Sequence, residues 1–226
     1  MRLAIFDVDG TLIAGKSTEK RFIAWLLHRG CLGPRQFASM IWHVPRRFPV
    51  YGRHVFRKNK AYLAGLSRQL VTEQAVRFVD SLPGTEWIGE SLGELRCHRE
   101  RGDTIVLLSG TLQPIIDTLA VRVGADAALG TICDYEDGRH TGRPPSRHPF
   151  YHAKAGLLDE ICSRYGAKAG DVVAYADSRF DIPLLERVGE PVAVGPDRGL
   201  ASWARGRGSR IIEYQRPLPE DSTGAT

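Results

Sequence analysis

Short apolar runs alternate with segments of helical spacing along most of the chain. The apolar runs are 3–6, 104–108, 172–175, 191–194 and, as a last candidate, 210–212. Runs that are apolar at every position are typical of strands buried on both faces of a parallel sheet. Helical spacing is found at 86–101, 112–123, 152–165 and 182–188. This alternation predicts an α/β fold with a Rossmann-like, doubly wound parallel sheet.

The alternation is interrupted directly after the first apolar run. Residues 15–83 contain no further run of that kind and show helical spacing at 19–29, 35–47, 53–66 and 72–81. We therefore expect a helical cap domain at 15–83, inserted into a core domain that consists of 1–14 and 84–213. The remaining residues, 214–226, are mostly small or polar and are expected to form a disordered tail.

A second interruption lies at residues 131–144. Alternating residues flank the dipeptide Asp137-Gly138 there. Such a dipeptide favours a two-residue hairpin turn, because both of its positions accept a positive φ. We therefore expect a small hairpin at this place.

The composition is that of an ordinary globular protein. With 226 residues, of which 42% are hydrophobic and 25% charged, the chain can form one large core and a modest second unit. The four cysteines include no C-x-x-C pair, which favours reduced thiols over disulfides. No signal peptide precedes the first run, and no apolar stretch approaches the roughly 20 residues of a membrane span. We therefore expect a cytoplasmic protein.

Polar side chains follow three of the predicted strands. Asp7 and Asp9 come after the first strand, Ser109 and Gly110 after the second, and Asp177 after the third. Because the carboxyl ends of parallel strands form the binding edge of a doubly wound sheet, we expect these groups to lie together. A carboxylate that attacks an anionic phosphate monoester needs compensating positive charge, which a divalent cation with oxygen ligands supplies.

Four motifs occur in a fixed order: DVDGT at Asp7, LLSGT at Ser109, HAKAGLL at Lys154, and YADSRFDIPLL at Asp177 and Asp181. This series resembles the haloacid dehalogenase (HAD) superfamily, subfamily IB, the phosphoserine phosphatase-like group. The resemblance covers nearly the whole chain. It implies a Rossmann-like core with a helical C1 cap inserted after the first strand.

The resemblance also implies roles in a Mg²⁺-dependent phosphohydrolase. Asp7 is the expected nucleophile, and Asp9 the expected general acid and base. Mg²⁺ is expected on Asp7, on the main-chain carbonyl of Asp9 and on Asp177. Asp181 is expected to steady Asp177 or a metal-bound water.

Phosphate binding is assigned by the same resemblance to Ser109, Gly110 and Lys154. The hydroxyl of Ser109 and the nearby main-chain N–H donate hydrogen bonds. The ammonium group of Lys154 offsets the charge of the carboxylates and of the transferred phosphoryl group. The second Asp of the first motif favours phosphoryl transfer, because dehalogenase-type and phosphonatase-type members of the superfamily lack it.

The chain departs from the family pattern in two places. Ala176 stands before Asp177, where the fourth motif usually has Gly. Phosphoserine phosphatases carry a Glu nine residues after the nucleophile, where this chain has Lys16. Phosphoserine is therefore not the expected substrate. Lys16, with Arg53 and Arg57 in the cap, suggests a substrate with a second anionic group. The Glu19 side chain, three residues after Lys16, would have to reach the substrate by a different path to replace the missing Glu.

We therefore expect hydrolysis of a small phosphorylated metabolite through an aspartyl phosphate. The alternatives are a phosphotransferase with the same intermediate, a lipid head-group phosphatase and a non-catalytic phospholigand-binding protein. No nucleic-acid partner is expected. The aromatic and basic run 40–58 leaves peripheral lipid contact open, although packing within the cap is the favoured interpretation. The sequence leaves the oligomeric state open.

The histidines offer no alternative metal site. Their spacing lacks the H-E-x-x-H pattern or a similar one. We expect five of the seven histidines at the surface or in the cap; they are His43, His54, His140, His148 and His152.

Overall fold

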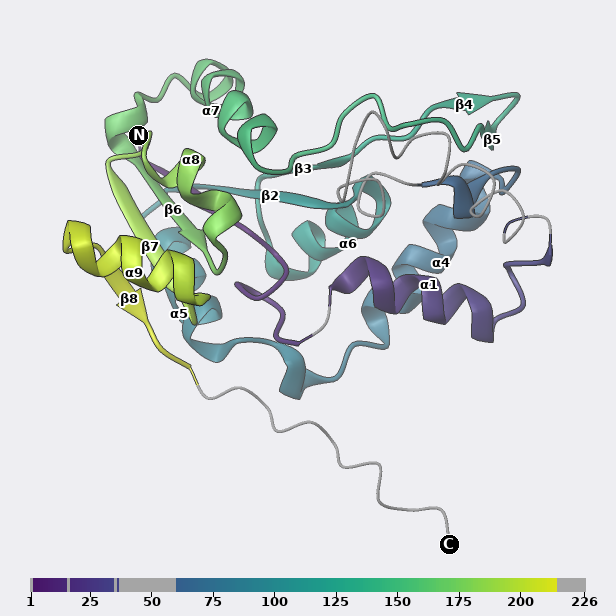
Figure 1. Cartoon of the computed structure of the whole chain (residues 1–226), viewed down its shortest axis with the longest axis horizontal. Helices are drawn as coiled ribbons and strands as arrows, with labels where there is room; N and C mark the ends of the chain where they lie inside the picture. Colours follow the sequence, from purple (N-terminus) through teal and green to yellow (C-terminus); the bar gives the residue numbers. More distant parts are fainter. Residues whose placement is uncertain (1, 16, 35, 37–59, 215–226) are drawn as a thin grey trace, which may run out of the picture.

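A six-stranded parallel sheet forms the centre of the protein in the computed structural model (Figure 1). Its order is β3-β2-β1-β6-β7-β8. The strands are β1 (Leu3–Phe6), β2 (Thr104–Leu112), β3 (Ala127–Thr131), β6 (Val172–Ala176), β7 (Glu190–Val194) and β8 (Arg210–Ile212). The structure describes residues 2–15, 17–34, 36 and 60–214. The expected doubly wound α/β fold is confirmed.

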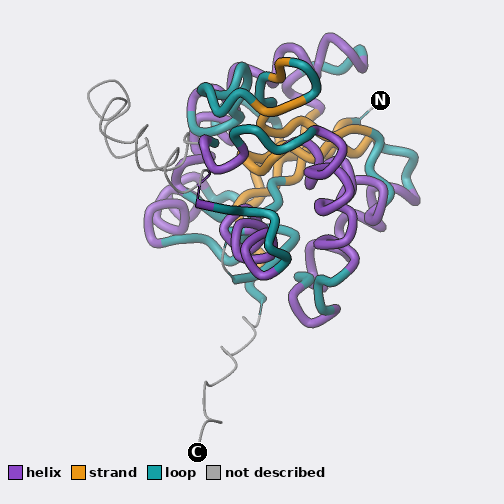
Figure 2. Tube along the Cα trace, turned by 90° about the vertical axis from the view of Figure 1, so that its right-hand side faces the viewer, coloured by secondary structure: helices purple, strands orange, loops and turns teal. Residues whose placement is uncertain are grey.

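Helices cover both faces of the sheet (Figure 2). They are α5 (Gly89–Glu100), α6 (Gln113–Val123), α7 (His152–Tyr165), α8 (Ile182–Leu185) and α9 (Arg198–Arg207). Short 3₁₀ turns lie at η2 (Ala61–Leu63), η3 (Gly84–Glu86), η4 (Ala169–Asp171) and η5 (Arg179–Asp181). Side chains of α5 and α6 belong to one apolar cluster, and those of α7, α8 and α9 to a second cluster.

β1 shows why its four residues are all apolar. Successive side chains of a strand point to opposite faces. Accordingly Ala4 and Phe6 belong to the first apolar cluster, and Leu3 and Ile5 to the second. All four residues are buried, so the strand lies at the centre of both cores and holds the residues that follow it in place.

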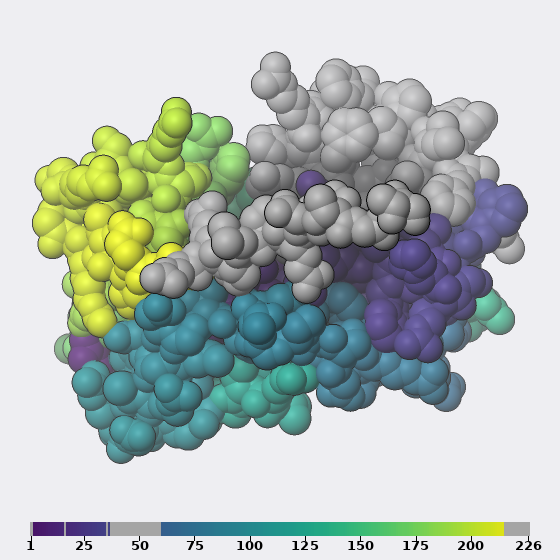
Figure 3. Space-filling model, turned by 90° about the horizontal axis from the view of Figure 1, so that it is seen from below, coloured from purple at the N-terminus to yellow at the C-terminus, as the bar shows by residue number. Residues whose placement is uncertain are grey.

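Helices inserted after β1 pack on the first of these faces. α1 (Thr18–His28) contacts α4 (Arg68–Asp80) through the rings of Phe22 and Phe78, whose centroids are 5.4 Å apart. Trp25 adds a hydrogen bond from its Nε1 to Oε1 of Gln74, at 2.9 Å. In Figure 3, α1 and the C-terminal elements α9 and β8 lie at opposite ends of the face shown.

Several expectations fall on residues outside the described part of the chain. They are Lys16, Arg53, Arg57, the whole aromatic and basic run 40–58, nearly all of the expected helix at 35–47, most of the one at 53–66, and nearly all of the tail.

The predicted hairpin is confirmed. β4 (Tyr135–Glu136) pairs antiparallel with β5 (Arg139–His140). Asp137 and Gly138 connect them with φ values of 50° and 72°. These positive values fit the turn that the dipeptide favours.

Two elements were not predicted from the sequence. β3 reads AALGT, and its small residues lack the β-branched run that indicates a strand. It forms because Val106, Leu107 and Leu108 of β2 provide a partner edge. α9 has few apolar positions, and Asp197 caps its amino terminus by accepting a hydrogen bond from the Leu200 N–H.

Four predicted boundaries were wrong by three residues or more. α4 begins at Arg68 rather than at residue 72, and α5 begins at Gly89 rather than at residue 86. β2 continues to Leu112, past the expected end at Leu108, although its register with β3 shifts between these two residues. Ser109 therefore lies within the strand, in its irregular part. α8 ends at Leu185 rather than at Val188. All four cysteines are free thiols, as expected.

Candidate active site

The register of β1 and β6 brings two carboxylates together. Phe6 pairs with Tyr175, and the Asp7 N–H continues the ladder by donating to the Tyr175 carbonyl at 3.0 Å. Asp7 and Asp177, which follow the two strands, therefore emerge at the same edge of the sheet. Together with Asp181 they offer one oxygen each, and these atoms all lie within 4.8 Å of one another.

Lys154 balances part of this negative charge. It lies in the first turn of α7 and is 3% exposed. Its Nζ donates to Oδ1 of Asp7 at 2.8 Å and to Oδ1 of Asp181 at 2.7 Å. Burial lowers the pKa of Lys154, but the attraction of Asp181 and Asp7 outweighs burial and raises the pKa overall. The ammonium group is therefore permanently charged at neutral pH.

Among the described residues, one lysine faces three carboxylates, of which those of Asp7 and Asp181 are buried. The pKa of Asp177 is raised by burial and then by its neighbours Asp7 and Asp181. The pKa of Asp181 is raised by burial and by Asp7, which together outweigh Lys154. Three carboxylates facing one ammonium group leave an excess of negative charge, and carboxylate oxygens are the ligands that Mg²⁺ prefers. The donor set therefore fits a hard divalent cation.

Gly10 permits the close approach of the first motif to Asp177. Its φ is +79°, and a Cβ placed on it would lie 2.0 Å from Oδ2 of Asp177. Any side chain at this position would both strain the backbone and displace the carboxylate. The glycine of DVDGT is thus needed for the site, and the motif is more than an acidic turn after a strand.

Asp9 has different surroundings from Asp7. Its Oδ1 accepts hydrogen bonds from the Thr18 N–H at 2.8 Å and from the Thr18 hydroxyl. The Thr111 hydroxyl lies 3.5 Å from its Oδ2. Burial raises the pKa of Asp9, although the Thr18 contacts act in the opposite direction. The side chain is held by the amino terminus of α1, so the inserted helices contact the first motif directly.

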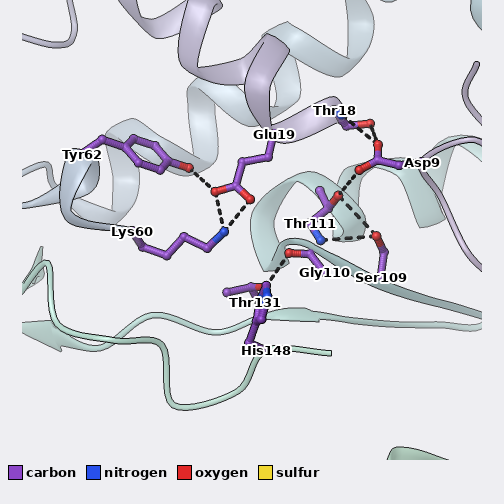
Figure 4. A network of polar contacts seen from close by, with 10 residues as sticks. All are labelled: Asp9, Thr18, Glu19, Lys60, Tyr62, Ser109, Gly110, Thr111, Thr131 and His148. Carbon is purple, nitrogen blue, oxygen red and sulfur yellow. Dashed lines mark hydrogen bonds and ion pairs between the residues drawn. The ribbon is translucent and has the colours of Figure 1, made fainter. Parts of the chain in front are cut away.

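Ser109 and Gly110 lie beside Asp9 (Figure 4). The Ser109 hydroxyl is buried and accepts a hydrogen bond from the Thr111 N–H at 3.3 Å. The Gly110 carbonyl accepts from the Thr131 hydroxyl at 2.6 Å. The single proton of the Thr131 hydroxyl is used in the hydrogen bond to Gly110. The Nδ1 of His148, 2.8 Å away, therefore donates a hydrogen bond to the Thr131 oxygen. This short chain of contacts fixes the backbone around Gly110.

A cavity of about 460 Å³ lies over these groups. It is lined by seven residues expected from the sequence, which are Asp7, Asp9, Ser109, Gly110, Lys154, Asp177 and Asp181. The structure therefore brings all the motif residues to one place, while Lys16, Arg53 and Arg57 lie outside the described residues. The volume is within the range of small-molecule sites.

Two histidines are not where the sequence suggested. His148 lines the cavity, and His140 is only 4% exposed. The expectation that they lie at the surface or in the cap was wrong for both, because the segment after the hairpin folds back over Gly110 and Tyr135 packs on the His140 ring.

Further residues at the cavity were missed in the sequence. Thr18, which contacts Asp9, is marked only by its place at the start of a helical pattern after Ser17. Phe150 and Phe180 form part of the wall, with ring centroids 5.1 Å apart. No local pattern identifies such wall residues, since they come from separate segments.

The inserted helices provide the remaining wall. Glu19 and Ile23 of α1, together with Tyr62, line the cavity. Lys60 and Tyr62 both bind the Glu19 carboxylate, as Figure 4 shows. The cavity is thus enclosed between the carboxyl ends of the strands and the helices inserted after β1.

Comparison with known proteins agrees with this geometry. The family of haloacid dehalogenase-like hydrolases matches residues 4–186. The chain belongs to this family. A phosphoserine phosphatase of Mycobacterium tuberculosis is 30% identical over 220 residues, which is 94% of this chain and 70% of that protein. A histidinol-phosphatase of Neisseria meningitidis is 25% identical over 228 residues, covering 94% of this chain and 99% of the relative.

Solved structures agree with the haloacid dehalogenase-like fold. A protein of Bordetella pertussis has 26% sequence identity and a TM-score of 0.78, covering 93% of this chain and 97% of that one. A phospho-aspartyl intermediate analogue of phosphoserine phosphatase has a TM-score of 0.62 at 19% identity, covering 97% and 96%. Helices after β1 and the phosphatase relatives place this chain in the phosphoserine phosphatase-like group. Within the described ranges, no helix combines the length and the apolar character that a bilayer crossing requires.

Proposed function

We propose that this protein hydrolyses a small phosphate monoester through a phosphorylated Asp7, with Mg²⁺ as cofactor. The observation that carries the proposal is the Lys154 ammonium group, which binds Asp7 and Asp181 at the base of a cavity, with Asp177 beside them. A carboxylate in these surroundings meets positive charge on the side from which a phosphate would arrive.

The first step transfers the phosphoryl group to the protein. An oxygen of the Asp7 carboxylate attacks phosphorus, the bond between phosphorus and the ester oxygen breaks, and the leaving alkoxide takes a proton from Asp9. Burial favours the protonated form of Asp9 by raising its pKa. Asp9 is therefore suited to donate that proton.

The second step releases phosphate. A water molecule gives a proton to the Asp9 carboxylate and attacks phosphorus, and the bond between phosphorus and Asp7 breaks. Asp9 returns to its protonated form and Asp7 to a free carboxylate. Thr18, which binds Asp9, keeps the carboxyl group in one orientation for both steps.

Phosphate is held by Ser109, Gly110 and Lys154 in this proposal. The Ser109 hydroxyl, the main-chain N–H of this segment and the Lys154 ammonium group donate to phosphate oxygens. Asp7, Asp177 and the Asp9 carbonyl would hold Mg²⁺, with Asp181 nearby to orient a bound water. When bound, Mg²⁺ supplies the charge that lets two anions approach.

The natural substrate is proposed to be a small phosphorylated metabolite. Relatives named for phosphoserine and for histidinol phosphate suggest where to begin. Lys16, Arg53 and Arg57 are proposed contacts for a second anionic group, which turnover of monoesters with and without a carboxylate would test.

The test is release of free phosphate from p-nitrophenyl phosphate and a metabolite panel. We expect release with Mg²⁺ and none with a chelator. Asp7→Asn should reduce the rate to below about a tenth, because an amide is a poor nucleophile. Asp126→Asn, remote from the cavity and bonded to the Ile105 N–H, is the matched control. Retention of more than a tenth of the rate by Asp7→Asn would contradict the proposal, and phosphate release in plain buffer separates a hydrolase from a phosphotransferase.

A further inference from the structure

The Glu19 carboxylate already accepts hydrogen bonds from two side chains of the protein. Lys60 Nζ lies 2.6 Å from Oε1 and 2.5 Å from Oε2 of Glu19, and the Tyr62 hydroxyl donates to Oε1 at 2.8 Å. An ionised carboxylate accepts about four hydrogen bonds. Residues in the described part of the chain occupy three of these positions, so room for about one more donor remains.

Only Glu19 of the ion pair faces the cavity. Its side chain is 16% exposed and lines the cavity wall, whereas the Lys60 side chain is 1% exposed. A molecule in the cavity can therefore reach the Glu19 carboxylate, while the ammonium group lies behind it. This differs from the base of the cavity, where Lys154 lines the wall itself.

Two titratable groups beside this pair are neutral. Burial and the Glu19 charge raise the pKa of Tyr62 well above its ordinary value. Burial raises the pKa of the nearby Cys133 thiol to about 12. Both therefore stay protonated at neutral pH and add no charge to the Glu19–Lys60 ion pair.

A balanced pair discriminates among ligands by charge. An ammonium group on the ligand would be a second cation beside a carboxylate that already binds one, and it would be repelled by Lys60. A hydroxyl group donates one hydrogen bond and adds no charge. Ile23, one helical turn after Glu19, also lines the cavity and offers an apolar contact for a short carbon chain.

We propose that Glu19 binds a neutral hydroxyl group on the alcohol part of the phosphate monoester. Lys60 is then a positioning residue that sets the preference for hydroxyl over ammonium. The substrate class is a hydroxyalkyl phosphate. This inference rests on the proposed phosphatase activity at the same cavity.

Two probes of equal size test the preference, 2-hydroxyethyl phosphate and 2-aminoethyl phosphate. The readout is the ratio of their kcat/KM values with the full chain and Mg²⁺. We expect the wild-type ratio to favour the hydroxyl compound. Lys60→Met leaves the Glu19 charge unbalanced, so the ratio should fall by about tenfold or more.

A second variant should change the ratio of the two kcat/KM values in the opposite direction. Glu19→Gln removes the negative charge and keeps Lys60, so the ratio should rise rather than fall. Lys20→Met is the matched control, because Lys20 also lines the cavity but is exposed, and solvent screens its charge. Its ratio should stay within about twofold of wild type. If Lys60→Met does not fold, Glu19→Gln decides.

Turnover of p-nitrophenyl phosphate, which has neither a hydroxyl nor an ammonium group, distinguishes failure of the proposed phosphatase activity from failure of the hydroxyl subsite. If the wild-type protein releases no phosphate from it or from the metabolite panel, the proposed function fails. If it does, but the wild-type ratio favours the amine, or both variants leave the ratio unchanged, or Lys20→Met shifts it as far as Lys60→Met, the hydroxyl subsite is refuted while the phosphatase stands.

Discussion

Asp7 and Asp9 are two residues apart, yet their surroundings suit them to different tasks. Asp7 accepts a hydrogen bond from the Lys154 ammonium group, which suits the carboxylate of the proposed nucleophile. Asp9 binds neutral donors, and burial raises its pKa. The contacts of each carboxyl group thus fit the two roles proposed for them, and the contact of Asp9 comes from α1.

Thr18→Val should slow chemistry without changing the fold. The valine side chain has nearly the same shape but cannot donate to Asp9, so the carboxyl group loses one of its fixed partners. We expect kcat for an alkyl phosphate to fall by about tenfold, a part of what a general acid contributes. The fall should be smaller for p-nitrophenyl phosphate, whose leaving group needs little protonation.

Thr18→Ser is the matched control, since it retains the hydroxyl group. Equal losses in Thr18→Val for both substrates, or a loss in Thr18→Ser as large as in Thr18→Val, would show that Thr18 does not act through the acid.

At the scale of elements, the first motif depends on neighbours that the sequence does not reveal. The strands that carry Asp7 and Asp177 were predictable, because their residues are apolar at every position. The closeness of Gly10 to Asp177 was not, since it depends on strand order and register. β3 and α9 were missed for a related reason: their stability comes from pairing and capping rather than from their own pattern.

Asp197 connects one of these missed elements to the proposed metal site. Its Oδ1 caps α9, and its Oδ2 accepts from the Arg179 N–H at 3.0 Å and from the Ser178 hydroxyl at 3.3 Å. Its own N–H donates to the Asp177 carbonyl at 2.8 Å. The start of α9 therefore holds the loop that carries Asp177 and Asp181.

Asp197→Asn should weaken Mg²⁺ binding more than it weakens the helix. Asparagine still caps α9 through its side-chain oxygen, but its amide nitrogen cannot accept from Arg179 or Ser178. We expect the dissociation constant for Mg²⁺, measured by calorimetry, to rise by about tenfold. Asp126→Asn should leave it unchanged, and an unchanged constant in Asp197→Asn would mean that the loop is held by other contacts.

At the scale of the whole molecule, the carboxylates of the site lower the stability of the folded state when no cation is bound. The raised pKa of Asp177 means that the folded state binds this proton more tightly than the unfolded state does. The contribution of Asp177 to stability therefore falls as pH rises from about 4, the ordinary aspartate value, towards the raised value.

Asp177→Asn should consequently stabilise the protein in a chelator at neutral pH. We expect Tm to rise by at least about 2 °C, the shift that about 1 kcal/mol produces in a domain of this size. The difference from wild type should shrink towards pH 4, and Mg²⁺ should no longer raise Tm. A variant less stable than wild type in chelator at every pH would contradict this explanation.

The central claim is that Asp7 carries the phosphoryl group during turnover. The most direct measurement is to mix the protein with a phosphate monoester labelled in its phosphoryl group, quench in acid within one turnover, and map the label by peptide. We predict label on the peptide with Asp7 in wild type and none in Asp7→Asn. Continued turnover with no trapped label, or label on a different residue, would contradict the account.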